Sequence, residues 1–169
     1  TACNNILNAC EELILGNGVL SFNHTSVLKN KICSSRKFYS YFSSREEIVI
    51  CLLLRRTVAY EIEHFLQLHS ELPVIAKLFV PTLMTFEVSR IDPIYQKACL
   101  MATNIGAWQV AHEEKQKKLT IAENRYMATI HDVVKLAIES EELLTDCFEH
   151  IVNDLYFYNM GKLMALGTI

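Results

Sequence analysis

The chain has 169 residues, of which 51% are hydrophobic and 21% charged, and its formal net charge is −3. This length fits one compact domain, or a small domain fused to a medium one, and the composition excludes a disordered chain. With only 5 Gly and 3 Pro, an all-β protein is excluded as well, because tight turns consume these residues.

The first forty-odd residues predict three short helices. Apolar residues recur at helical spacing from Ile6 to Ile14, and the segment Gly16-Asn17-Gly18 has the chemistry that ends a helix. Asn23 is suited to cap a second helix that runs to about Asn30. Ser34 is suited to cap a third, which covers residue 35 to about residue 41.

Longer helices follow these three. Ser43-Ser44 before Arg45-Glu46-Glu47 predicts a new helix start, with acids in the first turn where the helix dipole favours them. The expected helices span about 45–68, 74–90, 93–103, 107–138 and 145–166. Since no segment has a credible strand pattern, we expect an all-α protein. Residues 1–45 are predicted to form a helix-turn-helix domain, and residues 46–169 a larger helical domain.

The cysteines show no CxxC pair and no metal-like spacing; they are Cys3, Cys10, Cys33, Cys51, Cys99 and Cys147. We interpret them as reduced, small apolar residues. The longest apolar runs are too short to cross a bilayer, and the chain opens without a signal-peptide pattern. We therefore expect a cytoplasmic protein with no membrane partner.

The charges are unevenly distributed. Between Glu12 and Glu46 the sequence has no acidic residue, yet this stretch carries five cations: Lys29, Lys31, Arg36, Lys37 and Arg45. A basic segment followed by an acidic body is typical of a DNA reader with an attached regulatory domain, although chance clustering would give the same pattern.

The third helix has the composition of a recognition helix. Arginine and lysine bond guanine edges or phosphates, and serine and tyrosine hydroxyls bond the DNA backbone. The residues that suit these roles are Ser34, Ser35, Arg36, Lys37, Tyr39 and Tyr41. The alternative for the run from Phe38 to Phe42 is a purely aromatic core. We expect its two phenylalanines to pack in the core, and the hydroxyls of Tyr39 and Tyr41 to point outward.

Residues 33–48 resemble the recognition helix and its exit in the tetracycline-repressor (TetR/AcrR) family. Tyr39 and Phe42 match the family's Tyr-x-x-Phe pair, and Ser44-Arg45-Glu46 with Ile48 matches the start of its fourth helix. Residues 6–10, Ile-Leu-Asn-Ala-Cys, resemble the family's first helix, and Gly18 its following glycine. The resemblance covers about the first quarter of the chain.

This resemblance implies a DNA-binding regulator. It places Asn23 near a phosphate, Ser34 to Lys37 in the major groove, and Tyr39 and Arg45 on the DNA backbone. Two departures predict weaker DNA affinity: Ile32 replaces a glycine that commonly takes positive φ, and residues 1–5 carry no cation. The alternative is a helical protein-interaction module of the same architecture that has lost specific DNA binding.

The resemblance also implies a homodimer that releases its operator when a small apolar or amphipathic effector binds, most simply as a repressor. The large apolar residues suited to an effector pocket are Phe65, Phe79, Leu83, Phe86, Tyr95, Met101, Trp108 and Tyr126. Those suited to a dimer interface are Val152, Leu155, Tyr156, Asn159 and Leu163. The alternative role of every residue in these two sets is packing in the hydrophobic core of the chain.

The sequence gives little support for metal binding or catalysis. His64 and His69 are five residues apart, which does not place them on one helical face, and His112-Glu113-Glu114 lacks the second histidine of a zinc-protease helix. Phosphate-binding glycine loops and nucleophile motifs are missing too. We therefore expect a protein that is not an enzyme, with no metal and no cofactor beyond an unknown effector.

Overall fold

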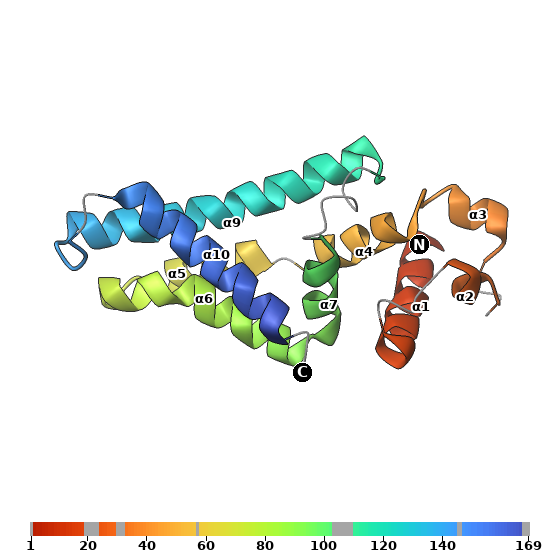
Figure 1. Cartoon of the computed structure of the whole chain (residues 1–169), viewed down its shortest axis with the longest axis horizontal. Coiled ribbons are helices and arrows are strands. Elements are labelled where there is room, and N and C mark those ends of the chain that lie inside the picture. Colours follow the sequence, from red (N-terminus) through yellow and green to blue (C-terminus); the bar gives the residue numbers. More distant parts are fainter. Residues whose placement is uncertain are drawn as a thin grey trace. The chain divides into compact units, whose positions relative to one another are not determined.

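The computed structural model describes residues 2–18, 24–29, 33–56, 58–102, 110–144 and 147–166 (Figure 1). Every regular element in these ranges is an α-helix, so the all-α prediction is confirmed. The predicted break near Asn104-Ile105-Gly106 and the predicted cap at residues 145–146 lie outside the described residues. No helix in the described ranges is long and apolar enough to span a bilayer.

The first compact unit comprises residues 1–56 and 92–119. Its described helices are α1 (Ala2–Asn17), α2 (His24–Lys29), α3 (Ser35–Tyr39), α4 (Arg45–Leu54), α7 (Pro93–Ala102) and the beginning of α9 (Glu113–Glu139). One hydrophobic core joins the first five of these, since Ile6 of α1, Val27 of α2, Phe38 of α3, Ile48 of α4 and Ile94 of α7 are all buried in the same cluster. The three short N-terminal helices therefore share a core with α7.

The second unit comprises residues 57–91 and 120–169. It holds α5 (Val58–Leu68), α6 (Val74–Ile91), the rest of α9, and α10 (Phe148–Leu166). Leu78 of α6, Val134 of α9 and Val152 of α10 meet in its core. Helix α10 packs directly against α6. The prediction of a domain boundary at residue 45 stays a prediction.

The predicted single helix over residues 45–68 is wrong, because the structure ends α4 at Leu54 and begins α5 at Val58. At the break, the Arg56 amide donates to the Leu53 carbonyl instead of the Leu52 carbonyl four residues back. The Arg56 guanidinium satisfies that Leu52 oxygen instead, at 2.9 Å. A side chain thus replaces the next helical hydrogen bond, and the helix stops where the first unit ends.

Several predicted helix ends are confirmed. Gly18, after α1, has φ +78°, the left-handed conformation that glycine adopts without strain. Asp92 caps α7, since its Oδ1 accepts from the amides of Ile94 and Tyr95 at 2.9 and 3.1 Å. Helix α3 is shorter than predicted and ends at Tyr39.

Candidate nucleic-acid interface

The predicted recognition segment, α3, begins at the predicted cap. The Oγ of Ser34 accepts from the Lys37 amide at 3.3 Å, and the residue has extended backbone angles, φ −72° and ψ 153°. At the other end, the Ser40 hydroxyl donates to the Lys37 carbonyl at 2.7 Å. Two serines therefore fix both ends of a five-residue helix that is too short to be stable alone.

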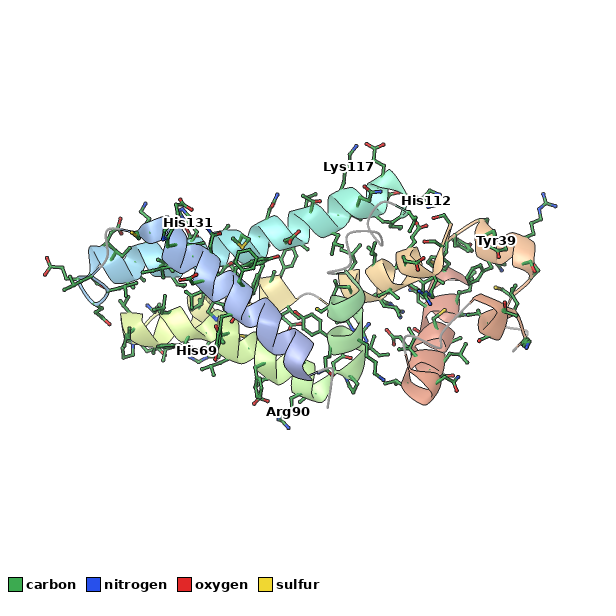
Figure 2. All side chains as sticks on the ribbon, viewed as in Figure 1. Tyr39, His69, Arg90, His112, Lys117 and His131 are labelled. Atoms are coloured by element: carbon green, nitrogen blue, oxygen red, sulfur yellow. The ribbon has the colours of Figure 1, made fainter. Side chains whose placement is uncertain are left out.

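Helix α3 has one buried and one exposed side. The rings of Phe38 and Phe42 are 1% exposed, and their centroids lie 5.8 Å apart, so the prediction that they form core is confirmed. The predicted DNA-facing residues of this segment are all exposed, namely Ser34, Ser35, Arg36, Lys37, Tyr39 and Tyr41. Figure 2 labels Tyr39 on this helix. Two cations and two phenols are thus presented to solvent on a fixed aromatic base.

The remaining predicted DNA contacts have different surroundings. Arg45 is half-buried, and its Nη2 forms an ion pair of 3.1 Å with the Glu46 carboxylate beside it. Asn23 and the unusual Ile32 of the turn lie outside the described residues. The structure therefore brings together the six candidates at positions 34–41 as one exposed group.

A buried carboxylate anchors the helix that follows. The Ser44 Oγ caps α4 by accepting from the Glu47 amide at 3.0 Å. The Glu47 side chain, which is 0% exposed, accepts from the Ser43 amide at 2.7 Å and from the Ser43 hydroxyl. It also accepts from His112 Nδ1, directly before α9, which Figure 2 labels. Glu47 therefore ties the exit of α3 to the start of α9.

These contacts also set the ionisation of Glu47. Burial by itself raises the pKa of this carboxyl, but the hydrogen bonds from Ser43 and His112 outweigh it and hold the pKa below its ordinary value. The carboxylate is therefore charged at neutral pH. Neither partner was expected from the sequence; the spacing Ser44-x-x-Glu47 is the one signal that marks Glu47 as a capping residue.

A second polar contact joins α1, α4 and α7. The Arg56 guanidinium donates to Glu11 Oε1 of α1 at 2.6 Å and, through Nε, to Asp92 Oδ2 at 2.8 Å. Asp92 is the residue that caps α7, so one arginine links the first helix of the unit to the cap of another. Sequence reasoning identified the Asp92 cap but missed Arg56, because its partners are 45 and 36 residues away.

Comparison with solved structures supports a specific fold. The chain matches Salmonella enterica GusR, a TetR-family repressor, with a TM-score of 0.60 and 20% sequence identity, over 96% of this chain and 81% of that one. The chain has the tetracycline-repressor fold. Neither the family models nor the curated proteins gave a match. The similarity therefore rests on the arrangement of the helices.

Within this tetracycline-repressor fold, the predicted effector-pocket residues have different surroundings, and their role stays a prediction. Phe79, Leu83 and Phe86 are exposed along one face of α6, whereas Tyr95 is buried in the first unit. Phe65 packs against the His69 ring on α5, with centroids 4.3 Å apart. Tyr126 packs beside the core of the second unit. The Met101 side chain and Trp108 lie outside the described residues.

The residues predicted for the dimer interface of this fold lie on the inner face of α10. Val152 is buried, and Leu155 and Tyr156 pack against the core of the second unit. Asn159 is buried too, and the Leu163 side chain lies outside the described residues. The opposite face of α10 exposes Phe157 and Tyr158, at 68% and 53%.

Proposed function

We propose that this protein is a DNA-binding transcriptional regulator, most simply a repressor whose operator is released when a small apolar or amphipathic effector binds. One observation carries the proposal: Arg36 and Lys37 are exposed on a short helix whose other side is locked into an aromatic core. A rigid polar helix of this kind suits the major groove. The tetracycline-repressor fold supports the same function.

The charge of the segment adds to this support. Lys29 of α2 is exposed like Arg36 and Lys37, and no acidic residue lies between Glu12 and Glu46 to oppose them. Exposed cations of this segment would lower the free energy of a nearby phosphate backbone. Tyr39 and Tyr41 add hydroxyl groups suited to phosphate oxygens.

The proposal includes a homodimer, because two recognition helices must reach successive major grooves about 34 Å apart. The outer face of α10 suits the contact between protomers. Phe157 and Tyr158 supply exposed rings there. Gly161 follows on the same face, and a Cβ added to it would meet no atom within 4 Å. A partner helix can therefore come close at this glycine.

The experiment selects binding sites from random duplex DNA with the purified chain and measures affinity across salt concentrations. We expect sequence-specific binding whose affinity falls steeply with salt as counterions leave the DNA. Arg36→Ala and Lys37→Ala should each weaken specific binding by about 1–3 kcal/mol where they read bases. If they contact only phosphates, all sequences should be weakened alike, with a salt slope smaller by about 1.

Lys135→Ala is the matched control. Lys135 is an exposed cation of the second unit, paired with Glu139 at 3.8 Å. Because it carries one positive charge, its substitution changes the net charge as much as Arg36→Ala or Lys37→Ala does. It should leave DNA affinity unchanged. Salt-independent binding, or equal effects of all three substitutions, would contradict the proposal and favour a helical protein-interaction module without specific DNA binding.

A further inference from the structure

The second unit buries polar side chains where three of its helices meet. The Tyr126 hydroxyl of α9 lies 3.2 Å from the Thr85 hydroxyl of α6, and it accepts from Asn159 Nδ2 of α10 at 2.8 Å. Thr85 and Asn159 are 4% and 3% exposed. One turn from Thr85, the buried Ser89 hydroxyl donates to the Thr85 carbonyl at 2.7 Å. We call Thr85, Tyr126 and Asn159 the polar triad.

The triad leaves one atom without a partner. Asn159 Oδ1 is buried and accepts no hydrogen bond within the described part of the chain. Burying an amide oxygen without a donor costs free energy that an apolar side chain in the same place would avoid. An unpaired acceptor in a helical core would therefore be stabilised by a donor from outside the described part of the chain.

The residues around the triad indicate which kind of ligand could carry this donor. The ring of Tyr126 lies close to the ring of Tyr156, with centroids 6.4 Å apart, and both residues pack against the apolar core of the unit. The Tyr156 hydroxyl donates to the Glu123 carboxylate at 2.6 Å. An anionic ligand would place its charge near this carboxylate and the partial negative charge of Asn159 Oδ1, which is unfavourable. A neutral group fits the site better.

We propose that Asn159 Oδ1 is the anchoring acceptor of the effector site, and that the effector is an uncharged molecule presenting a hydroxyl or amide N–H on an apolar or aromatic body. This inference rests on the proposed function, since it names the ligand class of that regulator. The Tyr126 hydroxyl holds the Asn159 amide so that Oδ1 stays available. A site built around a buried acceptor discriminates strongly against ligands that lack the donor.

The test uses the full chain without DNA and three probes of similar size. 2-Phenylethanol carries the donor, (2-methoxyethyl)benzene is its ether without the donor, and phenylacetate is the anion. We expect titration calorimetry to show at least tenfold tighter binding of the alcohol than of either other probe. In the wild-type protein, the ¹³C signal of the Asn159 side-chain carbonyl should move with the alcohol and stay unchanged with the ether.

Two variants localise the effect. Asn159→Leu removes the acceptor and should reduce the alcohol-to-ether preference to about one. Ser89→Ala is the matched control, because it removes a buried hydroxyl of the same region that bonds the Thr85 carbonyl and not the amide. It should keep the preference. The carbonyl signal of the wild-type protein decides the question even if Asn159→Leu does not fold.

Several results would overturn the inference: equal binding of alcohol and ether, stronger binding of the ether or the anion, or an alcohol preference that Asn159→Leu retains. Failure of the alcohol to bind at tens of millimolar would overturn it as well, because a buried water would then be the only partner of Oδ1. The DNA-selection experiment is separate. An Asn159-dependent alcohol site in a chain that ignores DNA would refute the regulator and keep the ligand site.

Discussion

His112 Nδ1 lies 2.7 and 2.8 Å from the two carboxylate oxygens of Glu47, although 65 residues separate the pair in sequence. Glu47 is completely buried, whereas 60% of the His112 side chain is exposed. The contact joins the first turn of α4, directly after the proposed recognition helix, to the start of α9, the helix that continues into the second unit. The partly exposed imidazole of His112 thus bonds the buried carboxylate of Glu47.

His112→Ala should reduce the free energy of unfolding by about 1–3 kcal/mol, because the buried carboxylate of Glu47 loses a donor. Urea denaturation at pH 7 measures the change. His69→Ala is the matched control: His69 also pairs with a glutamate, Glu71, at 3.3 Å, but the Glu71 side chain is 70% exposed whereas that of Glu47 is buried. Its removal should cost less than about 1 kcal/mol. Equal losses in the two variants would contradict a special role for His112.

The stability that Glu47 provides should depend on pH. Because its folded pKa lies below the ordinary value of 4.5, the contribution is complete above that value and is lost as the pH falls through the folded pKa. Between pH 5 and pH 3, the wild-type free energy of unfolding should therefore fall more steeply than that of Glu47→Gln. Urea titrations at several pH values compare the two, and parallel curves would refute the prediction.

Arg56→Met should destabilise the first unit by about 2–3 kcal/mol, because the partly buried carboxylates of Glu11 and Asp92 lose their common cation. Arg56→Lys should recover little, since an ammonium cannot reach both acids and the Leu52 carbonyl as the guanidinium fork does. Arg90→Met, which breaks an exposed pair with Glu87, is the control and should cost under about 1 kcal/mol. Thermal or urea unfolding ranks the three variants.

Phe157→Glu should weaken the homodimer at least tenfold, about 1.4 kcal/mol, because it places a charge at the centre of the proposed contact between α10 helices. Sedimentation equilibrium measures the dissociation constant. Leu144→Glu, at a residue that is 87% exposed before α10, adds the same charge and should leave association unchanged. A monomeric wild-type chain, or a Phe157→Glu variant that still dimerises fully, would refute this interface.

The cysteines should react in the order of their exposure. The six cysteines carry thiols rather than disulfides, and burial raises the pKa of Cys10 to about 12, of Cys51 to about 11 and of Cys99 to about 12. Cys147 is exposed. Under native conditions at pH 8, a thiol reagent followed by mass spectrometry should label Cys147 first and these three only after unfolding. Rapid native labelling of Cys10 would contradict its place in the core.

The sequence was sufficient for features that depend on near neighbours. Ser34, Gly18 and Asp92 end or begin helices through hydrogen bonds or backbone angles within four residues, so their types and positions predicted the caps. The alternation of buried Phe38 and Phe42 with exposed cations followed from helical spacing in the same way. Interactions between residues this close in the sequence can be predicted from residue types and their spacing.

Tertiary structure decided the features that depend on distant partners. The predicted helix 45–68 breaks next to Arg56, whose guanidinium bonds Glu11 and Asp92. Helix periodicity alone could not tell which large apolar residues of α6 are covered, and Phe79, Leu83 and Phe86 proved to be exposed. Asn159, predicted for the dimer interface, donates a hydrogen bond to Tyr126 of another helix in the second unit. A partner 33 or more residues away leaves no trace in local spacing, because only the folded chain brings the two groups within hydrogen-bonding distance.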